Sequence, residues 1–208
     1  MKKVYIKTLS LLALTLVVTS CVKEDDFAIP TIKEVVFSEG FESTTTGSGS
    51  NEAAIALPGW ANFPVKGSRK WHSRTFSGNK YAEFSSFYSV APDTNDEIWL
   101  VTPAIDLSKT NNEILSFDTK VRFWQGAALT VLISENYDGT QAGLATATWT
   151  ELEATLPTAT SGEVFVSSGA IDVSQYNSAN VRVAFKYVGS RTGVTTTYQV
   201  DNIKIYEN

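Results

Sequence analysis

Short runs of alternating apolar and polar residues extend along residues 31–208, and clusters of Gly, Asn, Pro and Ser separate them. No convincing helical periodicity of any length interrupts this pattern. Alternation with a period of two is typical of β-strands. The pattern therefore predicts about ten strands, which cover Val35–Phe37, Lys70–Phe76, Tyr81–Phe84, Ile98–Val101, Ile114–Trp124, Leu129–Ser134, Thr148–Leu152, Val164–Ser167, Val181–Val188 and Tyr198–Tyr206.

In the run Val181–Tyr187 the odd positions are apolar, and two of the three even positions are cationic. This arrangement is typical of an antiparallel strand with one buried and one solvated face. Turn-forming residues separate the runs, for instance at Ser77, Gly78 and Asn79. We therefore expect an all-β fold, an antiparallel β-sandwich of jelly-roll type, in a single domain over residues 33–208.

Glu39 breaks the alternation near the start of this domain. With a period of two it shares a face with Val35, Phe37 and Phe41, so its carboxylate points toward an apolar surface. An unpaired buried carboxylate is destabilising. Glu39 therefore needs a partner, a cation, or exposure beyond the rim of the sheet.

A second break in the alternation lies near the C-terminus. Tyr198 and Val200 share one phase, whereas Ile203 and Ile205 have the opposite phase. The strand must absorb an extra residue around Asp201–Asn202. We predict a β-bulge there, which re-aims the Asp201 side chain.

Glu39 and Asp201 approach each other if the first and last strands are neighbours. Two carboxylates, with backbone carbonyls and water, suit the oxygen shell of Ca²⁺. Glu42 is a further candidate ligand. In the alternative interpretation, Glu39 ends its strand at the solvent edge, Asp201 forms a turn and Glu42 is an ordinary exposed acid. No D-x-D-x-D-G loop accompanies these residues.

The N-terminus has a different pattern. Lys2 and Lys3 precede an apolar run of about ten residues, which is about half the ~20 residues that a membrane-spanning helix needs. This pattern predicts a secretory signal peptide over residues 1–20. Cys21, the only cysteine, follows it, and a lone cysteine in an exported protein cannot form an internal disulfide.

The segment Val18-Thr19-Ser20-Cys21 resembles the lipobox of bacterial lipoproteins, in which the cysteine sulfur receives a diacylglycerol. The resemblance implies a lipid anchor at Cys21. The alternative is a signal peptide whose end happens to contain a cysteine.

The charged cluster Lys23-Glu24-Asp25-Asp26 lies in a tether expected over residues 21–32. It is either a solvated flexible spacer or a localisation signal. It resembles the surface-export signal of Bacteroidota lipoproteins, which implies an outer-membrane protein that faces the cell exterior.

Removal of residues 1–20 leaves 188 residues, enough for one large domain, and changes the net charge from −5 to −8. With 43% hydrophobic and 12% aromatic residues, the chain is expected to fold rather than to be a disordered tether. An acidic chain with one histidine is a poor binder of nucleic acid and a plausible binder of calcium.

Eight short motifs in the order of the chain resemble those of the choice-of-anchor J and cleaved-adhesin domains of Bacteroidota surface proteins. They are Phe41-Glu42, Pro58-Gly59-Trp60, Trp71, Leu100-Val101-Thr102-Pro103, Leu115-Ser116-Phe117, Leu132-Ile133-Ser134, Asp172-Val173-Ser174 with Val183-Ala184-Phe185-Lys186, and Asp201-Asn202. The resemblance implies a calcium-containing jelly roll used in adhesion or glycan handling at the cell surface. The chain lacks the Asp-rich loop that follows Pro-Gly-Trp in gingipain-type members, which argues against a second calcium site.

Catalysis is not expected. His72 is the sole histidine, so a Ser-His triad has one possible base, and a surface or edge role for His72 is favoured. The acids Asp96, Glu97 and Asp118 are available for glycoside hydrolysis, yet nothing distinguishes them from ordinary turn and strand acids. A zinc site lacks ligands.

Binding is the favoured class of function, because the chain is rich in aromatic residues that can stack on sugars. Trp124, Phe87 and Tyr88 are candidate platforms, although Trp124 can instead cover a second apolar surface. Trp71 is also a candidate, with packing in the core as its alternative. Arg69 is a candidate hydrogen-bond donor to a ligand, and a solvated charge is the alternative.

These expectations describe a lipid-anchored, surface-exposed binding module whose partner is a glycan or a host protein. The alternative is a structural accessory subunit of an outer-membrane or extracellular assembly. A concave face with clustered exposed aromatic residues favours a glycan, whereas a flat apolar patch favours a protein partner.

Overall fold

The computed structural model of the chain describes residues 33–48, 50–91 and 94–208. Lys33–Asn208 form one compact unit. The predicted signal peptide, Cys21 and the tether lie outside the described residues. Within the described ranges, no helix is long and apolar enough to cross a membrane.

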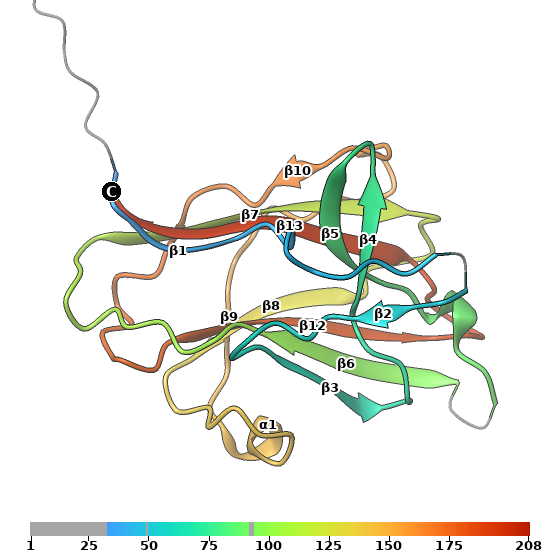
Figure 1. Ribbon diagram of the computed structural model, residues 1–208, viewed down its shortest axis with the longest axis horizontal. Coiled ribbons are helices and arrows are strands. Elements are labelled where there is room, and N and C mark those ends of the chain that lie inside the picture. The colour runs from blue at the N-terminus through green and yellow to red at the C-terminus, as the bar shows by residue number, and fades with distance from the viewer. Residues whose placement is uncertain (1–32, 49, 92–93) are drawn as a thin grey trace, which may run out of the picture. The chain divides into compact units, whose positions relative to one another are not determined.

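Two antiparallel β-sheets face each other in this unit (Figure 1), which confirms the expected all-β, two-sheet architecture. The larger sheet has the order β10 (Val166–Ser167), β7 (Glu113–Arg122), β13 (Thr197–Glu207), β5 (Asn79–Phe84), β4 (His72–Phe76) and β2 (Ala53–Ala54), with β1 (Val35–Glu39) beside β13 and β11 (Ile171–Asp172) beside β7. The smaller sheet has the order β3 (Ala61–Lys66), β6 (Asn95–Val101), β12 (Arg182–Ser190), β8 (Leu129–Ser134) and β9 (Thr150–Glu151).

Large inward-pointing side chains hold the two sheets together. Phe117 of β7 and Phe185 of β12 meet edge to face, with ring centroids 5.1 Å apart. Trp71, just before β4, packs against Phe84 of β5 and Tyr187 of β12, at centroid distances of 6.0 and 6.5 Å. All five are essentially buried. Burial of each such side chain stabilises the fold by about 1.5–3 kcal/mol.

Each of the ten predicted strand regions overlaps an observed strand, and the prediction missed β2, β3 and β11. β2 and β11 span two residues each, too few to show alternation. β3 contains Pro64, which argues against a strand because proline has no N–H to donate. In the structure β3 is an edge strand, and its register shifts between Pro64 and Lys66.

The predicted bulge in β13 is confirmed. The register of β13 with β7 shifts between Asp201 and Lys204, and Asn202 has a φ of 51°. Asparagine tolerates this left-handed conformation better than most residues. β1 pairs with β13 from Glu39 opposite Ile203, so the first and last strands are neighbours.

A second apolar cluster covers the outer face of the smaller sheet. Trp99 of β6 packs against Trp149, which also packs against Tyr137, at centroid distances of 5.1 and 5.3 Å. The short helix α1 (Gly143–Thr146) adds Leu144 to the cluster. This cluster covers the outer face of the smaller sheet where β6 lies.

Candidate functional site

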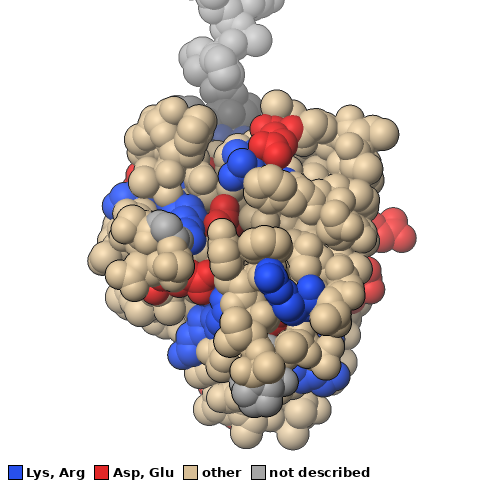
Figure 2. Space-filling model, turned by 90° about the vertical axis from the view of Figure 1, so that its right-hand side faces the viewer, with Lys and Arg blue, Asp and Glu red and all other residues tan. Residues whose placement is uncertain are grey.

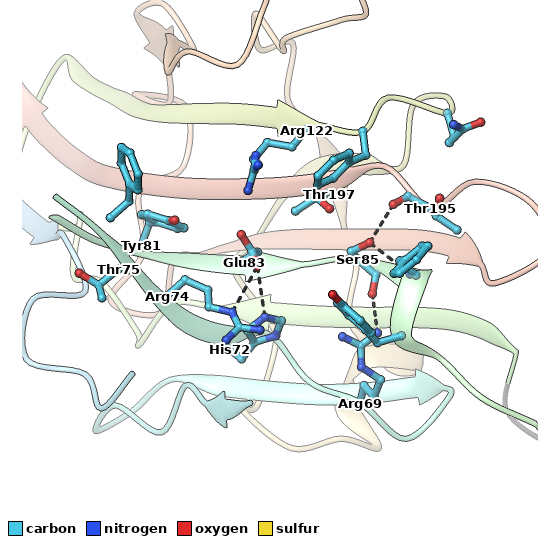
Figure 3. Close-up of a pocket in the computed structure, with 15 residues that line it drawn as sticks. Arg69, His72, Arg74, Thr75, Tyr81, Glu83, Ser85, Arg122, Thr195 and Thr197 are labelled. Atoms are coloured by element: carbon cyan, nitrogen blue, oxygen red, sulfur yellow. Dashed lines mark hydrogen bonds and ion pairs between the residues drawn. The ribbon is translucent and has the colours of Figure 1, made fainter. Parts of the chain in front are cut away.

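A cavity of about 610 Å³ lies over β4 and β5 on the outer face of the larger sheet (Figure 3). This volume falls within the usual range of ligand pockets, about 300–1,000 Å³. We call it the β4–β5 cleft. Its lining includes five ionisable side chains, Arg69, His72, Arg74, Glu83 and Arg122, and five aromatic ones, Phe76, Tyr81, Phe87, Tyr88 and Phe123.

Outward-pointing side chains of four adjacent strands form a row that begins with His72 and Glu83 in the floor of the cleft and continues beside it. His72 of β4 lies opposite Glu83 of β5, Glu83 lies opposite Gln199 of β13, and Gln199 lies opposite Lys120 of β7. Because neighbouring strands are about 4.8 Å apart, these side chains form one continuous polar row. The hairpin that starts this row turns at Ser77 and Gly78, whose φ values of 53° and 87° suit a two-residue turn, as predicted.

Glu83 is the centre of the interactions in this row (Figure 3). Its Oε1 lies 3.5 Å from His72 Nε2 and 3.4 Å from Arg74 Nε, and its Oε2 accepts a 2.7 Å hydrogen bond from Gln199 Nε2. Burial raises the pKa of Glu83, but hydrogen bonds from His72 and Gln199 and the charges of His72 and Arg74 outweigh it, so the net pKa is lowered. Glu83 therefore stays ionised and accepts hydrogen bonds.

His72 is only 2% exposed, so the expected surface or edge position for this residue is wrong. Its Nδ1 lies 3.8 Å from Glu52 Oε1, and its Nε2 faces Glu83. The alternation of β4 does point the ring outward, but the two carboxylates enclose it. Figure 2 shows that basic and acidic side chains also lie close to one another on the surface of this side of the domain.

Four aromatic rings remain exposed around the cleft. Phe76, Phe87, Tyr88 and Phe123 are 70%, 51%, 55% and 65% exposed. The rings of Phe87 and Tyr88 meet at right angles with centroids 5.0 Å apart. The cleft thus combines apolar rings at its rim with a charged floor.

Arg69 fixes the loop that carries two of these rings. Its Nε donates a 3.1 Å hydrogen bond to Glu52 Oε2, and its Nη2 donates to Glu52 Oε1. Its Nη1 donates to the carbonyl oxygen of Ser85 and to Ser89 Oγ, on either side of the 3₁₀ turn η1 (Ser86–Tyr88). The arginine that the sequence suggests as a ligand donor is therefore engaged within the protein, and it positions the rim.

Trp71 is not available for stacking, which corrects its assignment as a ligand-binding residue. It is 0% exposed and packs in the core. Its backbone N–H donates to Asn62 Oδ1, and its carbonyl accepts from Asn62 Nδ2, at 3.1 and 2.7 Å. The alternative interpretation from the sequence, packing within the fold, is the right one.

Trp124 also packs against the core, and its neighbour Phe123 lines the cleft instead. β7 ends at Arg122, and Phe123 has a left-handed φ of 50°. This conformation interrupts the alternation and reverses the directions of the two rings. No sequence pattern indicates this reversal, and the prediction therefore favoured the wrong aromatic residue.

The proposed calcium ligands Glu39 and Glu42 have partners within the protein. Glu39 Oε1 accepts a hydrogen bond from the backbone N–H of Phe41, and Glu42 Oε1 accepts one from the backbone N–H of Lys80. Among the described residues, no three or more His, Cys, Asp or Glu side chains are grouped as a metal site.

Asp201 is 2% exposed and accepts hydrogen bonds from Asn79 Nδ2 at 2.8 Å and from the Asn202 N–H at 2.7 Å. Burial raises its pKa, the two hydrogen bonds oppose the rise, and the charges of Asp118 and Glu42 add to it. Of the three predicted calcium ligands, Asp201 is therefore the one whose ionised carboxylate a nearby cation would stabilise.

Phe76 and Tyr81 are cleft residues that the sequence reasoning missed. Phe76 shares the phase of His72 and Arg74 on β4 and stands directly before the turn. The same alternation that predicts the strand would have placed its ring on the outer face. Phe76, Phe87 and Tyr88 meet around one cleft only in the folded chain, so no local sequence pattern indicates that they are neighbours.

A family model described as "Domain of unknown function (DUF5017)" matches residues 73–207, which include β5, β7, β13 and all of β4 except its first residue. The K3 cleaved adhesin domain of Lys-gingipain from Porphyromonas gingivalis is similar in structure, with a TM-score of 0.53 and 16% identity over 85% of this chain and 100% of that domain. The K1 domain of the same protein has a TM-score of 0.49 and 17% identity, over 83% of this chain and 98% of that domain.

The module TmCBM61, solved with beta-1,4-galactotriose, has a TM-score of 0.47 and 13% identity, over 81% of this chain and 94% of that module. No curated protein matches the sequence. The similarity to the K3 domain confirms the expected likeness to cleaved adhesin domains for the fold alone. The choice-of-anchor J name stays a prediction.

Replacement of Trp71 by alanine tests its role in the core. We expect Trp71→Ala to lower the free energy of unfolding by about 3–5 kcal/mol, because it leaves a large cavity between the sheets. Phe76→Ala, a matched loss of an exposed ring, should change it by less than about 0.5 kcal/mol. Urea denaturation measures both, and equal effects would contradict this assignment.

Proposed function

Because the chain belongs to the family described as a domain of unknown function (DUF5017), whose description assigns no activity, we propose its function from its own cleft. The protein is a non-catalytic binding module of jelly-roll type that holds a glycan chain in the β4–β5 cleft. The observation that carries this proposal is the ring of exposed aromatic side chains around a charged, hydrogen-bonding floor.

The chemistry of a sugar suits both parts of the cleft. A pyranose ring presents C–H groups on its faces and hydroxyl groups around its edge. The negative face of an aromatic ring attracts the C–H groups, so Phe87, Tyr88 and Phe123 can stack on successive sugars. Arg191 lies over the Phe87 ring and Arg122 over the Phe123 ring, at 4.4 and 4.9 Å from the centroids, and the exposed part of each ring is the surface that a sugar can contact.

The floor supplies partners for the hydroxyl groups. Glu83 is ionised, so its oxygens accept strong hydrogen bonds, and Arg74 and Arg122 donate charge-assisted ones. These charges are already held by neighbours in the protein, so the sugar meets a preorganised surface.

We favour glycan binding over the alternative of a structural accessory subunit. A surface for a protein partner would be a broad apolar patch. Here the exposed rings surround a concave cleft, and ionised groups lie between them.

We also propose that a lipid on Cys21 anchors the module at the outer membrane, facing the cell exterior. The lipobox-like segment before Cys21 and the charged cluster after it support this proposal. In this arrangement the tether over residues 21–32 connects the anchor to the domain.

Calcium near Asp201 is a further proposal. The buried carboxylate with a raised pKa and the adjacent acids Glu42 and Asp118 support it. Glu39 would join the site only by giving up its bond to the Phe41 N–H.

Glycan binding is tested with a glycan array followed by calorimetry on the purified protein. We expect Phe87→Ala and Tyr88→Ala each to weaken binding at least tenfold, about 1.4 kcal/mol, because each removes a stacking surface. Val65→Ala, an exposed position on the other sheet, is the control and should bind normally. Folded protein that binds no glycan would refute the proposal.

Lipid anchoring is tested by Cys21→Ser. We expect this variant to lose the acyl chains and to move from the membrane fraction to the soluble fraction, because serine has no thiol to receive the diacylglycerol. Mass spectrometry of the mature N-terminus gives an independent measurement. Membrane association unchanged by the substitution would contradict the anchor.

Calcium binding is tested by thermal unfolding with calcium and with EDTA. A cation bound only to the folded state adds about 2.7 kcal/mol at a hundredfold excess over Kd. Asp201→Asn should abolish this gain, and Glu39→Gln and Glu42→Gln test the other two candidates. An unfolding temperature of the wild-type protein that is the same with calcium and with EDTA would exclude the site.

A further inference from the structure

Lys120 of β7 lies beside the β4–β5 cleft inside a cage of aromatic rings. Its Nζ is 4.9 Å from the ring centroid of Phe165, 5.6 Å from that of Tyr81 and 5.9 Å from that of Phe76. A cation within about 6 Å of a ring centroid is attracted by the electrons of the ring face. Because Phe76 and Tyr81 also line the cleft, the cage holds the ammonium group at the edge of the cleft.

Lys120 differs from the arginines on the same sheet face in its lack of a carboxylate partner. Arg74 Nε lies 3.4 Å from Glu83, and Arg122 Nε lies 2.9 Å from Glu163. Within the described chain, no carboxylate oxygen lies within 4.0 Å of Lys120 Nζ, and no group accepts a hydrogen bond from it. The three donors of the ammonium group are therefore available to a ligand.

The surroundings of Lys120 favour an added negative charge. Partial burial and the like charge of Arg122 lower its pKa, and the more weakly acting charges of Glu163 and Glu83 oppose this effect. The rings replace water on several sides of the ammonium, and an ion pair is stronger where water is displaced. A neutral ligand that covered the cage would instead leave this cation without a counter-charge.

We propose that Lys120 forms a subsite for an anionic sugar, whose carboxylate or sulfate group accepts hydrogen bonds from the ammonium while the sugar ring packs against Phe76 or Phe165. This inference rests on the proposed glycan-binding function and gives it a substrate class, the acidic oligosaccharides. Phe165 is 36% exposed and Phe76 is 70% exposed, so both have free surface for that contact. The net charge of −5 for the whole chain does not prevent this, because the interaction is local.

Three oligosaccharides of equal length test the inference by calorimetry with the full-length protein, namely an oligogalacturonate, a sulfated galactose oligomer and a neutral galactose oligomer. We expect at least one acidic oligomer to bind at least tenfold more tightly than the neutral one at low salt. The preference should shrink as sodium chloride is added, because salt screens the ion pair. The two acidic oligomers distinguish a carboxylate from a sulfate as the recognised group.

Lys120→Met should bring the ratio of acidic to neutral affinity, measured within the variant, from at least tenfold to about one. Lys66→Met, an equal loss of charge on β3 of the other sheet, should keep the preference. Thermal unfolding verifies that each variant is folded. Equal affinity of the wild-type protein for the three oligomers, or an unchanged preference in Lys120→Met, would overturn the Lys120 subsite alone. Absence of binding to all three and to the glycan array would overturn the proposed function, and this inference with it.

Discussion

The pairing of β13 with three other strands is the constraint on which the larger sheet depends. β13 forms backbone hydrogen bonds to β7 along one edge. Along its other edge it pairs with β5 at Tyr198–Val200 and with β1 at Ile203–Tyr206. The neighbour changes at the bulge around Asp201–Asn202. Because strand side chains alternate between faces, β13 without the extra residue would point Ile203 and Ile205 away from the core. A single local irregularity therefore lets one strand join three neighbours and bury both of its halves.

The same alternation determines what the outer face of this sheet contains. With Phe84 of β5 and Tyr198 of β13 turned inward, Glu83 and Gln199 must point outward, beside His72 of β4. These polar groups are largely covered, and a covered charge destabilises a fold unless it is paired. The contacts of Glu83 with His72, Arg74 and Gln199 meet this requirement. The floor of the cleft is thus held in place by the contacts that compensate for the burial of Glu83.

The sequence predicts those features that depend on neighbouring residues. Alternation located the strands, and the change of phase around Asp201–Asn202 located the bulge, because both patterns are local. The reversal of Phe123 and Trp124 escaped prediction because it depends on one left-handed residue after the strand end. The cage around Lys120 escaped it for a different reason. Its rings come from positions as distant as Phe76 and Phe165, and only the packed sheet brings them together.

The exposed rings around the cleft contribute little to the stability of the fold. Each large apolar side chain left in water forgoes about 1.5–3 kcal/mol that burial would contribute. A single exposed ring such as Phe76 is common, but four around one cleft are not scattered at random. Their exposure is also imposed by the structure, because Arg69 fixes the loop of Phe87 and Tyr88 and a left-handed backbone directs Phe123 outward. A sugar that stacks on these rings recovers the missing burial, and rings already held in place lose little conformational freedom when it binds.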